Sequence, residues 1–161
     1  MTRIVIDTNI LVSAILTPKG NPAKILKLVL EGKLNLIISP AILKETRRVL
    51  RYPKLVKLMQ KNKITPDEVY NFLDKMSKVA FITPDALEID AIPDDPEDNK
   101  ILACGLEGEA DYIISGDHHL LDLRIFQGAK IVDPSTFLKI ISPRTAKLNI
   151  IGHKATIITE R

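Results

Sequence analysis

Short runs of β-branched and aliphatic residues alternate along this chain with segments that carry helix start and stop signals. The runs have the length of buried strands. We predict strands at Arg3–Ile6, Leu34–Ile38, Val79–Ile82, Tyr112–Ser115 and Lys130–Val132. Strands separated by helices usually form parallel sheets with helices on both faces. The sequence therefore predicts an α/β fold of three layers, α/β/α, with a central, mostly parallel sheet of about five strands.

Capping residues mark several of the intervening helices. Asn21-Pro22 and Gly32 bound a helix at Pro22–Glu31, and Ser39-Pro40 starts one that runs to about Leu50. Thr65 and Glu68 have the spacing of a capping box. Further helices are predicted at Asn9–Leu16, Pro53–Lys61, Asp98–Leu106, His118–Leu121 and 134–141. The segment 83–97 holds three prolines and is expected to be a loop.

Length and composition fit one domain with an aliphatic core. The chain has 161 residues, of which 45% are hydrophobic and only 4% aromatic, so base-stacking platforms are not expected. A net charge of +3 is compatible with a nucleic-acid partner without indicating one. Cys104 is the single cysteine, which excludes an intrachain disulfide. No run reads as a signal peptide or a membrane span, so a cytoplasmic location is expected.

Four acidic residues adjoin apolar runs where a chain like this should bury hydrocarbon: Asp7, Glu45, Asp98 and Asp117. Asp7 and Asp117 follow two predicted strands, and ligands gather at the carboxyl edge of parallel sheets. Clustered carboxylates repel each other unless a cation lies between them, and oxygen ligands suit Mg²⁺ or Mn²⁺. Each acid also has a structural alternative. Asp7 and Asp98 can cap helices, Asp117 can form a turn, and Glu45 can pair with Arg47 or Arg48.

Four stretches in this order resemble the PIN-domain nucleases, in particular the bacterial and archaeal branch that contains toxins of toxin–antitoxin pairs. The stretches are Val5-Ile6-Asp7-Thr8-Asn9-Ile10-Leu11, Ser39-Pro40-Ala41-Ile42-Leu43-Lys44-Glu45, Asp94-Asp95-Pro96-Glu97-Asp98-Asn99-Lys100-Ile101-Leu102 and Ala110-Asp111-Tyr112-Ile113-Ile114-Ser115-Gly116-Asp117. The resemblance covers about residues 1–141. It implies a PIN-like nuclease domain there, and leaves 142–161 as an extension that could be an edge strand, an oligomer contact or a mobile tail.

The resemblance implies an activity as well as a fold. PIN domains cut RNA with Mg²⁺ or Mn²⁺, and such ions neutralise the phosphodiester and activate water. The family's acidic quartet corresponds to Asp7, Glu45, Asp98 and Asp117, which become the expected catalytic and metal-binding residues. Asn9 and Ser115 match supporting polar positions. Family toxins are usually restrained by an antitoxin and often form homodimers, so both partners are expectations here, beside the RNA substrate.

Other polar residues near these motifs are weaker candidates. Asp95 could support the metal site or belong to a solvated acidic loop. His118 or His119 could contact a substrate phosphate, although neighbouring helical residues point apart, and we select His118. Basic residues just beyond Glu45 could guide an RNA backbone, or they could simply be solvated helix faces. We select Arg47, Arg48 and Arg51.

Two other functions remain open from the sequence. Asp7 could be a phosphoaspartyl nucleophile, as in haloacid-dehalogenase phosphatases, but that chemistry needs a second acid where this chain has Asn9. The chain could also be a catalytically weak, PIN-like module that binds RNA or protein. Retention of all four acids argues against that alternative.

Overall fold

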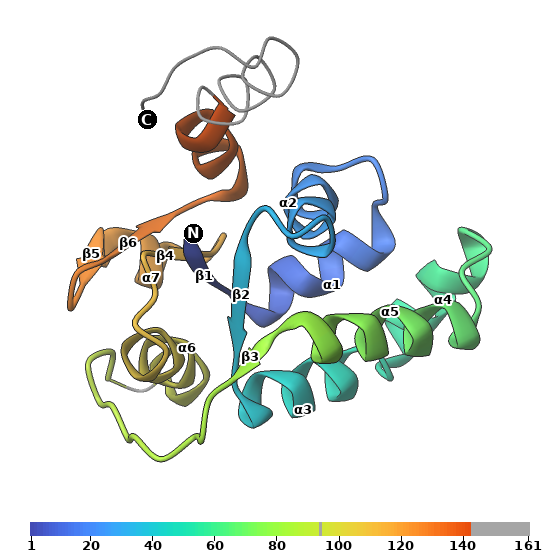
Figure 1. The fold of residues 1–161 in the computed structure, drawn as a ribbon. Coiled ribbons are helices and arrows are strands. Elements are labelled where there is room, and N and C mark those ends of the chain that lie inside the picture. Colours follow the sequence, from blue (N-terminus) through green and yellow to red (C-terminus); the bar gives the residue numbers. More distant parts are fainter. Residues whose placement is uncertain (94, 143–161) are drawn as a thin grey trace, which may run out of the picture.

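The computed structural model describes residues 1–93 and 95–142. Its centre is one sheet with the strand order β3-β2-β1-β4-β6-β5 (Figure 1). The strands are β1 (Arg3–Ile6), β2 (Asn35–Ile38), β3 (Phe81–Ile82), β4 (Tyr112–Ile114), β5 (Ile125–Phe126) and β6 (Ala129–Val132). Neighbouring strands are parallel except for β5, which is antiparallel to β6. The predicted three-layer, mostly parallel fold is confirmed.

The sheet has six strands, where the sequence predicted about five. The additional strand is β5, which has only two residues and therefore shows no alternating pattern. It joins β6 through Gln127 and Gly128, whose φ angles are 49° and 87°. Two consecutive positive φ angles are typical of the tightest hairpin turns, because that geometry matches the twist of the flanking strands.

The helices are largely those that the sequence predicts. They are α1 (Thr8–Leu16), α2 (Asn21–Leu30), α3 (Pro40–Val49), α4 (Pro53–Lys61), α5 (Pro66–Val79), α6 (Pro96–Glu107), α7 (His118–Leu123) and a last helix at 134–142. Thr65 and Glu68 form the predicted capping box. Three starts differ from the prediction, and the first is that of α1, which begins at Thr8 rather than Asn9. The N-cap of α2 is Gly20 rather than Asn21, and α6 starts at Pro96 rather than Asp98 because Asp95 caps it.

Helix α6 packs closely on the face of the sheet formed by β1, β2 and β4, with α1 and α2 on the opposite side (Figure 1). Two glycines permit this approach. A Cβ atom at Gly105 would lie 2.8 Å from Ile113 Cδ1, and one at Gly108 would overlap Ile37. The last helix is held by Phe137, whose buried ring meets Tyr112 edge-to-face at 5.2 Å.

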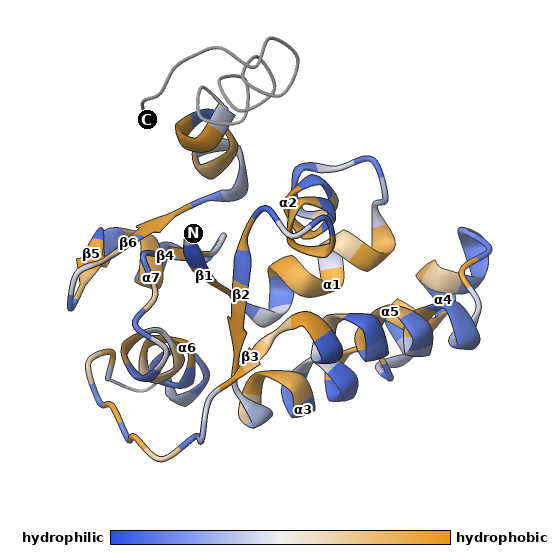
Figure 2. Cartoon of the chain, viewed as in Figure 1, coloured by the Kyte–Doolittle hydropathy of each residue, from blue (hydrophilic) through white to orange (hydrophobic). Residues whose placement is uncertain are grey.

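The core is aliphatic, as the composition predicts. The central strands are hydrophobic beyond their first residues, as Figure 2 shows for β2, and Ile4, Val5, Ile113 and Ile114 are fully buried. A second, smaller cluster of Val12, Ile15, Leu50 and Leu73 attaches the α4–α5 region to the rest of the molecule. Burial of this apolar surface is the main source of stability.

The expectations for the segment 142–161 lie, from residue 143 onward, outside the described residues. The domain boundary near residue 141 stays a prediction. Within the two described ranges, none of the helices combines the length and the apolar character that crossing a membrane would require.

Candidate functional site

The parallel register of β1 and β4 places two site residues side by side. Ile6 pairs with Ile114, so the next residues along the two strands, Asp7 and Ser115, meet at the carboxyl edge of the sheet. The Ser115 hydroxyl donates a hydrogen bond to Asp7 Oδ2, and Asp7 Oδ1 accepts one from the Ile10 amide at 3.0 Å. Asp7 is only 5% exposed, and this burial raises the pKa of its carboxyl group.

Ser115 also connects Asp7 to Asp117. Its hydroxyl oxygen accepts a hydrogen bond from the Asp117 amide at 2.9 Å, while its hydroxyl proton is donated to Asp7. Asp117 in turn caps α7, because its Oδ1 accepts from the His119 amide at 2.8 Å. A single buried serine thereby holds two acids that come from neighbouring strands.

The start of α6 brings further acids to the same edge. Asp95 Oδ1 accepts a hydrogen bond from the Asp98 amide at 3.3 Å and caps the helix. Asn99 fixes the preceding loop, since its Oδ1 accepts from the amides of Ala91 and Ile92 at 3.0 and 2.9 Å. Its Nδ2 donates to the Ile92 carbonyl at 2.8 Å. Sequence reasoning gave Asn99 no role, although a polar residue one turn before buried Ala103 was an available signal.

Four side chains converge at this edge: Asp95, Asp98, Asp117 and His119. One potential ligand atom from each lies within 4.8 Å of the other three. His119 Nδ1 is 3.5 Å from Asp95 Oδ2 and 3.8 Å from Asp117 Oδ1. We call this set the four-residue cluster. It combines three carboxylates with one imidazole and therefore offers mainly oxygen ligands.

Asp98 is the least satisfied member of the four-residue cluster. It is 7% exposed, and its Oδ2 is buried without a hydrogen-bond partner among the described residues. Burial, together with a hydrogen bond to Asp95 and the negative charges of Asp117, Asp95 and Asp7, raises the pKa of Asp98 to about 7. The pKa of Asp95 is lowered, chiefly because it receives the hydrogen bond from Asp98.

These observations fit a divalent cation. A buried carboxylate oxygen without a partner costs free energy, and adjacent negative charges add to that cost. A cation bound among the carboxylates would satisfy the oxygen and remove the repulsion, and an oxygen-rich ligand set suits hard divalent ions. Asp7 adjoins the cluster and its charge acts on Asp98, but both of its oxygens already accept hydrogen bonds.

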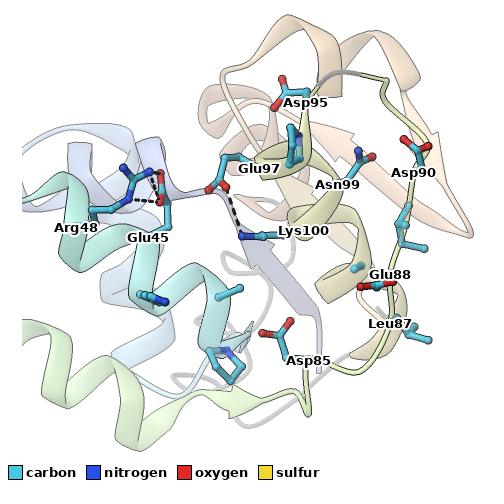
Figure 3. A pocket seen from close by; sticks show the side chains of 16 residues that line it. Glu45, Arg48, Asp85, Leu87, Glu88, Asp90, Asp95, Glu97, Asn99 and Lys100 are labelled. Carbon is cyan, nitrogen blue, oxygen red and sulfur yellow. Dashed lines mark hydrogen bonds and ion pairs between the residues drawn. The ribbon is translucent and has the colours of Figure 1, made fainter.

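Glu45 lies outside the four-residue cluster. Together with Asp95 and Glu97, it lines a cleft of about 990 Å³ between α3 and α6 (Figure 3). Its carboxylate accepts three hydrogen bonds from Arg48, at 2.9, 2.6 and 2.8 Å, as Figure 3 shows. This is the local ion pair that the sequence left open as the alternative. Glu45 therefore faces the cleft beside the cluster, with Arg48 as its present partner.

The other predicted residues line two further pockets. Arg47 and Arg51 line a separate, largely apolar pocket of about 660 Å³ beside α4 and α5. Asn9 and His118 are exposed and line a pocket of about 450 Å³ together with three members of the four-residue cluster, Asp95, Asp117 and His119.

The structure thus brings Asp95, Asp98 and Asp117 together, with Asp7 and Ser115 adjoining. His119, and not the selected His118, joins the acids. Asp117 caps α7, and this places the second residue of the helix beside the acids. The spacing of two residues between Asp117, a possible helix cap, and His119 is the sequence signal that could have identified His119.

Comparison with known proteins gives two matches. A family model described as PIN domain matches residues 3–119, a range that includes all four predicted acids. The chain is also 34% identical over 138 residues to an uncharacterized protein of Methanocaldococcus jannaschii. That alignment covers 86% of this chain and 80% of the archaeal protein.

Proposed function

The chain belongs to the PIN domain family, and from this premise we propose that it is a divalent-metal-dependent endoribonuclease that hydrolyses RNA phosphodiester bonds. PIN domains are generally nucleases. The observation that carries the proposal is the buried, unpartnered Asp98 Oδ2 within the four-residue cluster. A carboxylate in that state has little structural use and a clear use as a metal ligand.

The proposed ion is Mg²⁺ or Mn²⁺. It would be held by Asp98, Asp117 and Asp95. When bound, such an ion supplies positive charge that neutralises the phosphodiester and polarises its oxygens. Asp7 contributes negative charge at the same edge and is oriented by Ser115. Because Arg48 binds Glu45, we propose that Glu45 turns from Arg48 toward the cleft when a cation and RNA are present.

The chain's own residues also set the protonation of the site. Without a cation, burial and the neighbouring acids raise the pKa of Asp98 to about 7, so its carboxyl group is partly protonated near neutral pH. A cation would favour loss of that proton, so that the carboxylate of Asp98 becomes available as a ligand. The proposed contacts to the RNA backbone are exposed His118 and the basic side chains of Arg47, Arg48 and Arg51. Asn9, which lines the same pocket as Asp117, is a proposed supporting residue of the acids.

We further propose that the enzyme is a toxin restrained by an antitoxin protein, and that it acts as a homodimer in the cytoplasm. The support for this is the resemblance of its motifs to the toxin branch of the family. A small reading frame beside the gene, and co-purification of its product with this chain, would be the expected result. Purification of a free monomer with no such neighbour would contradict the proposal.

The activity is tested with Asp98→Asn, which keeps the shape of the side chain and removes its charge. RNA cleavage with Mn²⁺ or Mg²⁺ should fall by about 100-fold or more, since loss of charge stabilisation worth several kcal/mol corresponds to at least that factor. Asp122→Asn, at an exposed position on α7, is the matched control and should cleave like the wild type. Chelation of divalent ions should abolish cleavage in all three proteins.

Undiminished cleavage by Asp98→Asn would exclude the proposed site. An absence of cleavage in the wild type, with RNA binding retained, would favour the weak binding module instead. The phosphotransferase alternative is disfavoured because both Asp7 oxygens accept hydrogen bonds within a buried site. An acyl-phosphate trapped on Asp7 would restore it.

A further inference from the structure

We propose that His119 is a nitrogen ligand of the bound cation, and that it makes the site favour borderline first-row transition ions such as Co²⁺ or Fe²⁺ over Mg²⁺. This inference rests on the proposed function and deepens it by assigning a metal class. It does not follow from the acids alone, because carboxylate ligands also suit Mg²⁺, whereas an imidazole ligand adds affinity for transition ions.

The position of the imidazole supports a ligand role. Nδ1 lies 3.5 Å from Asp95 Oδ2 and 3.8 Å from Asp117 Oδ1. Both distances exceed the usual 2.7–3.2 Å of a direct N–H···O hydrogen bond. Neighbouring ligands of one ion lie roughly 3–3.5 Å apart, given metal–ligand bonds of about 2.1 Å. The first distance is at the upper end of that range and the second is slightly longer, so the nitrogen lies beside two carboxylate oxygens of the cluster at nearly the spacing of shared ligands.

A second observation identifies that point as a ligand site. Asp98 belongs to the same four-residue cluster and carries a buried Oδ2 with no hydrogen-bond partner among the described residues. An ordinary His–Asp ion pair would leave this oxygen unsatisfied. An ion held jointly by His119 and Asp98 would satisfy both groups.

The backbone also directs His119 into this position. Its amide donates to Asp117 Oδ1 at 2.8 Å, so the cap of α7 holds the residue beside a second cluster member. The ring of His118 lies against it with centroids 4.3 Å apart. The side chain of His119 is 54% exposed, so its replacement should not disturb the core.

The expected preference follows from ligand chemistry. Mg²⁺ strongly prefers oxygen ligands and keeps several waters, whereas imidazole binds transition ions well. Affinity at a mixed nitrogen–oxygen site rises from Mn²⁺ through Fe²⁺ and Co²⁺ to Ni²⁺. An imidazole ligand should therefore add affinity for Co²⁺ while adding little for Mg²⁺.

The test compares the intact wild-type protein with His119→Gln and with the control Asp122→Asn, an exposed position on the same helix. Calorimetric titrations with Co²⁺ and with Mg²⁺ measure both affinities, and the visible absorption of bound Co²⁺ reports its ligands. His119→Gln should weaken Co²⁺ binding by about 10- to 100-fold and Mg²⁺ binding by less than about 3-fold. It should also shift the Co²⁺ absorption bands. Asp122→Asn should leave both affinities and the spectrum unchanged.

An unchanged ratio of Co²⁺ to Mg²⁺ affinity in His119→Gln, with an unchanged Co²⁺ spectrum, would overturn the inference. Equal effects of His119→Gln and Asp122→Asn would do the same. Asp98→Asn separates this failure from failure of the proposed function, because it should weaken binding of both ions. If Asp98→Asn binds both ions normally, the metal site itself is misplaced.

Discussion

At the scale of single residues, Asp98 is the side chain on which the proposed metal site depends most. The side chain sits in the first turn of α6, almost fully buried, within reach of two other cluster acids. The capping bond from its own amide to Asp95 fixes the backbone there. Asn99 fixes the loop behind it. The result is an acid held in a position that is unfavourable for a lone charge, which is common at functional sites.

This arrangement predicts a pH dependence of stability in the metal-free protein. The folded state raises the pKa of Asp98 from 3.8 to about 7, so between these values it binds more protons than the unfolded state. The free energy of unfolding should therefore decrease as the pH rises from about 4 to about 7. Asp98→Asn should reduce this slope, measured by urea denaturation at a series of pH values.

Asp122→Asn is the control and should keep the slope of the wild type. Saturating divalent cation should also flatten the wild-type slope, because the cation stabilises the charged carboxylate. If Asp98→Asn and the wild type lose stability in parallel over this range, Asp98 is not the group that is held protonated.

At the scale of elements, the distance between α6 and the sheet decides where the acids of that helix lie. Gly105 and Gly108 allow the helix to approach β4 and β2, and the start of the helix then reaches the edge where β1 and β4 end. A larger residue in this interface would move the helix, and with it Asp98, away from Asp117.

Gly108→Ala should therefore destabilise the protein by about 1–3 kcal/mol, since the new methyl group would overlap Ile37 in a packed core. The same variant should bind Mn²⁺ more weakly, measured by calorimetry on the folded protein. Gly116→Ala is the steric control for stability, because its Cβ atom would lie 3.6 Å from Ile10 Cδ1, an ordinary contact. Equal stability of Gly108→Ala and the wild type would show that the contact between α6 and the sheet can accommodate a methyl group at this position.

At the scale of the whole molecule, charge is divided between two regions. The cleft beside the cluster is lined by six carboxylates and three basic side chains, so it repels a phosphate chain unless cations are bound. Exposed basic side chains lie instead along α3, α4 and the turn that follows. They are Arg47, Arg51, Lys54, Lys57, Lys61 and Lys63. The RNA substrate proposed above would find clustered positive charge for its backbone in this region.

This division predicts how salt affects RNA binding. In an Asp98→Asn background, which should not cleave, Arg47→Gln with Arg51→Gln should weaken binding of single-stranded RNA. The slope of log K against log salt should become shallower by about 0.7 for each phosphate that the protein no longer neutralises. Fluorescence anisotropy at several salt concentrations measures the RNA affinity and the slope. Lys24→Gln with Lys27→Gln removes the same charge from α2 and should keep the slope. Identical slopes in the two double variants would show that the basic region does not contact the RNA backbone.

Much of the fold could be predicted from local signals. The strands at Arg3–Ile6 and Tyr112–Ile114 are dense apolar runs, and the helices begin at recognisable caps such as Ser39 and Thr65. Such signals depend on residues that are close in the sequence, so they can be read without knowledge of the tertiary structure. Strand β5 was missed because its pairing with β6, and not its own two residues, makes it a strand.

The candidate site likewise has features that local sequence signals predict and features that depend on tertiary packing. The sequence by itself determined which acids stand at strand and helix ends, and therefore that Asp7, Asp98 and Asp117 were candidates. Only the tertiary structure decided that Asp95 and His119 join them, that Glu45 pairs with Arg48, and that one Asp98 oxygen is left without a partner. Residue type and spacing specify the local backbone. Distances between side chains on different elements depend on strand register and on how closely α6 packs, and these are properties of the assembled core.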